Sequence, residues 1–312
     1  MAAFPKTGWG LGLWTAALLI ALLGGGPVTH AQQNTAEEAA RRQAALAALP
    51  QDAARRVFGL AATPAPGPGQ PIGSYSKGCL AGGVEMPADG PNWQVMRPSR
   101  NRAWGHPALI AFLQRLASAG EAAGWRGLLV GDLAQPRGGP MLTGHASHQL
   151  GIEADIWLTP MPDRRLTPEE RNEISATNVV AENGQDIDPA VWRPEHRKLL
   201  ERAARDPAVD RMFVNPAIKR ALCREATGDR QWLRRIRPWY GHNYHFHVRL
   251  ACPTGAAQCR SQAPLPPGDG CGADLAWWFT PEARAPQPIQ PTRPLLVSEM
   301  PQACTALVMP AR

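Results

Sequence analysis

Alternation of apolar and polar residues predicts strands in the middle of the chain. Residues 151–158 place aliphatic side chains on one face and Glu153 and Asp155 on the other. Residues 245–250 alternate in the same way, and the apolar segment 127–132 has the composition of a buried strand. We therefore expect a sheet built from these segments.

Helical spacing of apolar residues predicts helices around these strands. Residues 106–120 place leucine and phenylalanine side chains on one stripe, with Pro107 in the first turn. Residues 167–170 (Thr-Pro-Glu-Glu) have the spacing of a capped helix start, and Asn215 precedes another helix. Because strands and helices do not alternate as regular βαβ units, we expect an α+β fold. Its core is an antiparallel sheet, flanked by helices and by long loops stitched together by disulfides.

The start of the chain has the pattern of a cleavable signal peptide. Lys6 supplies a positive charge, residues 11–23 form an apolar run, and small residues allow cleavage after Ala31. A membrane anchor is the alternative, but the run is shorter than the roughly 18–20 residues of a spanning helix. We therefore expect residues 1–31 to be removed on export, and no later segment is apolar for long enough to span a bilayer.

Two segments of biased composition flank the predicted catalytic domain, which we place at residues 71–280. Residues 32–70 are rich in alanine and proline, with a helical pattern followed by a Pro/Gly-rich linker. Residues 281–312 are again proline-rich, but Cys304 lies among them. We therefore expect a disulfide to tie this C-terminal tail back to the domain.

The six cysteines all follow the expected signal peptide: Cys79, Cys223, Cys252, Cys259, Cys271 and Cys304. An even number in an exported chain indicates disulfides. A thiolate metal site is the alternative, but no C-x-x-C pair occurs. A local bridge between Cys252 and Cys259 would close a short loop, and the spacing leaves the other pairings open.

The formal net charge is +7, from 33 Lys and Arg against 26 Asp and Glu. Such a balance suits nucleic acid or an anionic polymer of the cell envelope. No basic motif interleaved with aromatic residues is present, and the chain is expected to be exported. We therefore expect no nucleic-acid partner.

Five of the eight histidines fall in two tight clusters, in residues 144–149 and 241–247. His106 and His196 stand alone, and for both we expect a structural role. In the second cluster, His245 and His247 are two apart on a predicted strand, so their imidazoles project from the same face.

A convergence of His148, Asp155 and His247 would form a metal site. Gly151 lies between His148 and Asp155 and can turn the chain into the strand that carries Asp155. If this strand neighbours residues 245–250 in an antiparallel sheet, the three side chains meet. Two imidazoles and one carboxylate, with a fourth position left for water, are typical of a catalytic zinc site.

The two histidine segments also resemble a known family. Their sequences are Gly-His-Ala-Ser-His-Gln-Leu-Gly-Ile-Glu-Ala-Asp-Ile (144–156) and Gly-His-Asn-Tyr-His-Phe-His-Val-Arg-Leu-Ala-Cys-Pro (241–253). They are similar to the penicillin-insensitive murein endopeptidases, H-x6-D…H-x-H metallopeptidases akin to the lysostaphin and D-alanyl-D-alanine carboxypeptidase groups. The similarity extends from about Ile72 to Phe279 and includes Gly105-His-Pro107.

The resemblance implies a role for each residue of the two clusters. His148, Asp155 and His247 become zinc ligands, and His145 lies beside the metal as an extra ligand. His245 becomes the catalytic histidine, with His242 at the same site. The resemblance also implies three disulfide pairings: Cys79–Cys304, Cys223–Cys271 and Cys252–Cys259.

The function implied is hydrolysis of the D-alanyl–meso-diaminopimelyl amide that cross-links peptidoglycan in the periplasm. Zinc activates the attacking water. The H-E-x-x-H motif that supplies a glutamate base is absent, so His245 is the expected base. One alternative is a zinc DD- or LD-carboxypeptidase acting on stem peptides. Another is a noncatalytic wall-binding module with the same fold.

Other polar residues near the two clusters have weaker signals. Arg249 suits either a substrate carboxylate or a structural ion pair, and Glu153 is a candidate for orienting a ligand imidazole. Ser147 lacks the S-x-x-K pattern of acyl-enzymes, so we expect it to be structural. Family members can carry an Asp and a His at a second metal site, but Asn183 and Asp186 occupy the matching positions. We therefore expect no second zinc ion.

Overall fold

The computed structural model describes residue 1, residues 30–285 and residues 293–309. The expected signal peptide lies outside this part, apart from Met1, His30 and Ala31. Within the described residues, no helix is both long enough and apolar enough to cross a membrane.

The main sheet has seven strands in the order β10-β9-β11-β8-β7-β5-β4. Their bounds are β4 Asp89–Gly90, β5 Trp93–Val95, β7 Leu128–Val130, β8 Glu153–Trp157, β9 Val209–Val214, β10 Ile236–Pro238 and β11 His245–Leu250. β11 is antiparallel to both of its neighbours, β8 and β9, as expected. The pairs β5–β7 and β9–β10 are parallel, so the sheet is mixed around its antiparallel strands. Each parallel pair is joined through a helix, the connection that parallel strands require: α3 between β5 and β7, α6 between β9 and β10.

Two small antiparallel sheets accompany the main one: β1 Gln70–Ser74 with β2 Lys77–Ala81, and β3 Val84–Glu85 with β6 Trp104–Gly105. The α-helices are α1 His30–Ala48, α2 Ala54–Leu60, α3 Pro107–Ala122, α4 Pro168–Glu173, α5 Pro194–Arg205, α6 Pro216–Glu225, α7 Ala273–Trp277, α8 Pro281–Arg284 and α9 Gln302–Val308. Short 3-10 turns occur at η1 Pro98–Arg100, η2 Gln231–Arg235 and η3 Val297–Glu299. Helices combined with a mixed sheet confirm the α+β class.

The predicted helix starts are present and capped by the expected side chains. Thr167 begins α4 with a complete capping box. The Asn215 side chain accepts a hydrogen bond from the backbone of α6. His106 does the same for α3, which gives this isolated histidine a structural role. His196 is also structural, because its ring contacts backbone groups of Arg193 and Leu158.

One apolar core joins α3 and α5 to the aliphatic face of the sheet. This face carries Ala154 and Ile156 of β8 and Phe246 and Val248 of β11, all fully buried. Burial of these side chains orients both strands, because a shift of one residue would turn them to the opposite face. The polar side chains of β8 and β11 consequently share the other face.

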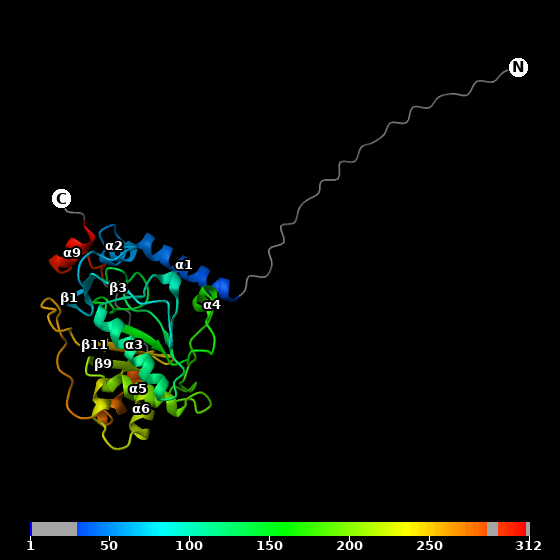
Figure 1. Ribbon diagram of the computed structural model, residues 1–312, viewed down its shortest axis with the longest axis vertical. Helices are drawn as coiled ribbons and strands as arrows, with labels where there is room; N and C mark the ends of the chain where they lie inside the picture. The colour runs from blue at the N-terminus through cyan, green and yellow to red at the C-terminus, as the bar shows by residue number, and fades with distance from the viewer. Residues whose placement is uncertain (2–29, 286–292, 310–312) are drawn as a thin grey trace.

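A second, smaller core packs the N-terminal extension against the C-terminal tail. It contains Phe58 of α2, Ile72 of β1 and Val297 of η3, and the Cys79–Cys304 disulfide lies within it. In Figure 1, α1, α2 and α9 accordingly lie together at one end of the molecule, away from α5 and α6.

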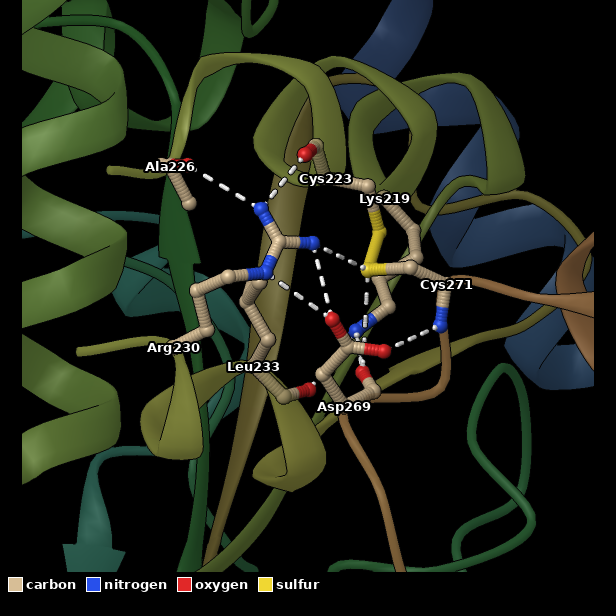
Figure 2. The surroundings of a disulfide bond; sticks show 7 residues. All are labelled: Lys219, Cys223, Ala226, Arg230, Leu233, Asp269 and Cys271. Atoms are coloured by element: carbon tan, nitrogen blue, oxygen red, sulfur yellow. Dashed lines mark hydrogen bonds and ion pairs between the residues drawn. A yellow bond between two sulfur atoms is a disulfide. The ribbon is translucent and has the colours of Figure 1, made fainter. Parts of the chain in front are cut away.

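The structure contains all three disulfides that the resemblance implies: Cys79–Cys304, Cys223–Cys271 and Cys252–Cys259. Figure 2 shows the polar groups around Cys223–Cys271. The buried Lys219 amine donates to the carbonyl oxygens of Leu233 and Asp269, both at 2.7 Å. Arg230 pairs with the Asp269 carboxylate at 2.8 Å. These contacts hold the loop before α7 against α6.

Candidate metal centre

Atoms of His148, Asp155 and His247 converge on the polar face of the sheet. Nε2 of His148 lies 3.1 Å from Nδ1 of His247. Oδ1 of Asp155 lies 3.4 Å from the first nitrogen and 3.3 Å from the second. The structure thus brings together the three residues that sequence analysis expected to meet.

The strand register produces this convergence. β11 pairs with β8 so that His247 lies directly opposite Asp155. His148 comes from the preceding loop and has a left-handed backbone with φ of 65°. Its backbone N–H donates to Oε2 of Glu153 at 2.7 Å, which helps to hold this unusual conformation. Gly151, with φ of 66°, then turns the chain into β8, as its position predicted.

Hydrogen bonds behind the two imidazoles determine which nitrogens face the centre. Nδ1 of His148 lies 2.7 Å from the Leu133 carbonyl oxygen, an acceptor, so this nitrogen carries the proton. Nε2 of His247 lies 2.8 Å from Oε1 of Glu153. Burial opposes ionisation of Glu153, but the hydrogen bond from His247 and the Arg249 charge lower its pKa to about 2. Glu153 is therefore a carboxylate and accepts the His247 proton, as expected of a residue that orients a ligand.

These three groups fit a bound cation. In neutral imidazoles, the two inward nitrogens present lone pairs to each other. Oδ1 of Asp155 is buried and has no hydrogen-bond partner among the described residues. Ligands of tetrahedral zinc, at bond lengths of about 2.0–2.1 Å, lie roughly 3.3–3.4 Å apart. The observed spacing of 3.1–3.4 Å matches that arrangement.

His145 forms a looser set with two of the same residues. His145, His148 and Asp155 offer ligand atoms within 4.8 Å of one another. Nδ1 of His145 lies 3.6 Å from Oδ2 of Asp155, and its Nε2 lies 3.0 Å from Oδ2 of Asp132. Because the atoms of His247 are closer to those of His148 and Asp155, the set that includes His247 suits a metal ion better. His145 stands beside it.

His245 and His242 lie beside the three converging residues. Nε2 of His245 is 3.5 Å from Oδ2 of Asp155, and its buried Nδ1 has no partner among the described residues. The rings of His242 and His245 are 4.9 Å apart. Burial lowers the pKa of His245, and burial together with the neighbouring His245 imidazole lowers the pKa of His242 to about 4. Both imidazoles are thus neutral near pH 7 and able to accept a proton.

A cavity of about 390 Å³ opens beside these groups. Its wall consists of Arg97, Arg100, Gly131, Asp132, His145, Asp155, Trp157, Ser175, Ala176, Tyr244 and His245. Several of these residues were not identified from the sequence. Asp132 is one, although its place at the end of the predicted strand 127–132 was a usable signal. Its carboxylate accepts hydrogen bonds from Arg102 at 3.0 Å and from Arg100 at 3.2 Å.

The remaining sequence candidates lie apart from the centre or behind it. The buried Arg249 side chain donates a hydrogen bond to Glu153 at 2.7 Å, which bears out the structural ion-pair alternative. Asp186 pairs with Arg224, and the Asn183 side chain caps its own turn at Gln185. Neither residue belongs to a group of potential metal ligands among the described residues.

Comparison with known proteins agrees with the resemblance. The sequence model of the penicillin-insensitive murein endopeptidases matches residues 71–309, which extends beyond the expected domain end at residue 280. The Haemophilus influenzae protein of that name is 50% identical over 215 residues, covering 69% of this chain and 75% of its own length. The corresponding Klebsiella pneumoniae protein is 44% identical over 246 residues, covering 78% and 88%. That of Yersinia enterocolitica is 42% identical over 245 residues, covering 78% and 87%. On this evidence, the chain belongs to the penicillin-insensitive murein endopeptidase family.

Proposed function

We propose that this protein is a zinc-dependent murein endopeptidase that hydrolyses the D-alanyl–meso-diaminopimelyl cross-links of peptidoglycan in the periplasm. The observation that supports it most directly is the convergence of His148, Asp155 and His247 at 3.1–3.4 Å beside an open cavity. The names of the similar proteins support murein as the substrate. Three disulfides fit an oxidising compartment outside the cytoplasm.

The proposed zinc ligands are His148, Asp155 and His247, with His145 beside them. When bound, zinc lowers the pKa of water and polarises the scissile carbonyl group. Glu153 keeps the imidazole of His247 in the tautomer that can bind the metal. Burial opposes ionisation of Asp155, but interactions with His245, His145 and His148 outweigh it and hold the pKa of Asp155 well below the usual range.

His245 is the proposed general base and acid. Its neutral imidazole takes a proton from the attacking water and then gives it to the leaving amine. It lines the cavity and is held next to Asp155, so it reaches the space that a scissile amide would occupy. His242 is close enough to assist the proton transfer or to donate to the developing oxyanion. Since no serine is acylated in this scheme, β-lactams have no nucleophile to trap.

Digestion of purified sacculi by the zinc-loaded protein tests this proposal. The expected result is loss of dimeric muropeptides and gain of monomers, abolished by a chelator and unaffected by penicillin. Shortened monomers with the dimers intact would instead indicate a carboxypeptidase. Binding to sacculi without any new product would indicate a noncatalytic wall-binding module.

A further inference from the structure

Arg97 is the cationic side chain of the cavity wall that lacks a carboxylate partner. Its guanidinium lies 5.5 Å from the centre of the Trp157 ring, which belongs to the same wall. Nη1 donates to the backbone carbonyl oxygens of Arg171 and Asn172. These contacts anchor one edge of the guanidinium. Among the described residues, no acceptor contacts Nε or Nη2, so the other edge is available.

The second arginine of the wall differs in this respect. Arg100 pairs with Glu38 of α1 at 2.6 Å and with Asp132 at 3.2 Å. Burial and the nearby Arg100 charge lower the pKa of Arg97, whereas Asp132 and Glu38 outweigh burial and raise that of Arg100. Among the described residues, Arg97 therefore has no carboxylate in direct contact, and an anion in the cavity would stabilise its charge.

The backbone also directs Arg97 to this place. It has a left-handed conformation with φ of 58°, and its N–H donates to the Arg171 carbonyl oxygen at 3.1 Å. Such a conformation is costly for a residue with a long side chain and persists where the surroundings enforce it. The loop after β5 is thereby held so that Arg97 lies in the wall that Asp155 and His245 share.

The proposed substrate carries an anion next to the scissile bond. In a D-alanyl–meso-diaminopimelyl cross-link, the carbon that bears the scissile nitrogen also bears a free carboxylate. Arginine binds carboxylates through two parallel hydrogen bonds, which gives orientation as well as affinity. We propose that Arg97 binds this carboxylate and so selects the free-acid form of the diaminopimelyl residue. This inference rests on the proposed function.

Two cross-linked dimers test it, one with that carboxylate free and one with the same carboxylate amidated. The zinc-loaded wild-type protein is expected to prefer the free acid by roughly 10- to 100-fold in kcat/KM, mostly through KM, since one charged hydrogen-bonded pair is lost. Arg97→Gln should lower hydrolysis of the free acid by the same factor and leave the amidated dimer unchanged. Arg97→Lys keeps the charge and should recover part of the preference.

Arg126→Gln is the matched control, because Arg126 is exposed and pairs with Asp163 away from the cavity. It should keep the wild-type preference. The inference would be overturned if Arg97→Gln lowered kcat/KM equally on both dimers. It would also be overturned if the wild-type protein had the same kcat/KM for the two dimers. The wild-type comparison needs no variant and therefore holds even if Arg97→Gln fails to fold. If zinc-loaded wild type cleaves neither dimer, the proposed function itself fails.

Discussion

Nε2 of His148 lies 3.1 Å from Nδ1 of His247. The other nitrogen of each ring donates a hydrogen bond, to the Leu133 carbonyl oxygen from His148 and to Glu153 from His247. Two lone pairs at this distance repel unless a proton or a metal ion lies between them. Close contacts with the Asp155 and Glu153 carboxylates outweigh burial and raise the pKa of His247. A zinc ion bound between the two inward nitrogens would relieve the repulsion of their lone pairs.

His247→Ala is expected to abolish both zinc binding and hydrolysis. It removes one of the three proposed ligands and leaves the Glu153 carboxylate without its imidazole partner. Zinc per chain after dialysis, together with dimer cleavage, measures the effect. His106→Asn is the control, since asparagine also caps a helix and His106 lies outside the site. A His247→Ala protein that kept one zinc ion and wild-type turnover would disprove the ligand assignment.

His245→Ala should keep its zinc and lose most turnover. The ring lines the cavity and is not part of the closest set of ligand atoms. Loss of a general base lowers rates by about 10²- to 10⁴-fold. Single-turnover rates on a soluble dimer, with zinc content measured on the same sample, separate chemistry from metal loss. Normal turnover would exclude His245 as the base.

Glu153→Gln is expected to weaken zinc binding without removing a ligand. The Glu153 carboxylate accepts hydrogen bonds from the His148 backbone, the His247 ring and the Arg249 side chain. The substitution removes the negative charge that these three donors contact. Substitution of such a supporting group typically costs about 10- to 100-fold in metal affinity. Competition with a chelator gives the affinity. The exposed Glu169→Gln should show no change, and an unaltered affinity in Glu153→Gln would contradict the prediction.

Lys219 should make the protein more stable as the pH rises above 7. Burial, aided by the Arg237 charge, lowers its pKa from 10.5 to about 7. Between these values the unfolded chain binds a proton that the folded chain does not, so the free energy of unfolding increases with pH. The slope is at most about 1.4 kcal/mol per pH unit.

Urea unfolding at several pH values in this window measures the slope. Lys219→Met should be less stable overall, because the carbonyl oxygens of Leu233 and Asp269 lose their donor, and its slope should be flatter. Lys198→Met, at a largely exposed lysine on α5, should keep the wild-type slope. A wild-type stability that falls between pH 7 and 10 would refute the assignment.

The disulfides should differ in their contribution to stability. Cys79–Cys304 spans 225 residues and Cys252–Cys259 spans 7. On the chain-entropy account, opening them by paired Cys→Ser substitutions costs about 5 and about 2 kcal/mol respectively. Urea midpoints of the two double variants test the order. A larger loss from opening the short loop would reject this account for the protein.

The separate elements were largely predictable, because they depend on neighbouring residues. The alternation in residues 245–250 reflects a strand with one aliphatic face, and β11 has these bounds. The caps at Thr167 and Asn215 are short-range hydrogen bonds, so their residue types were informative. The parallel pairing of β5 with β7 and of β9 with β10 was not predictable in this way, since it depends on packing between distant segments.

The sequence by itself determined that His245 and His247 share a strand face, and that a glycine turn separates His148 from Asp155. Only the tertiary structure decided which residues meet. Pairing of β8 with β11 puts His247 opposite Asp155, and burial places Arg249 behind Glu153. Arg97 reaches the cavity from a distant loop. Side-chain periodicity is local, whereas register and burial follow from apolar contacts spread along the whole chain.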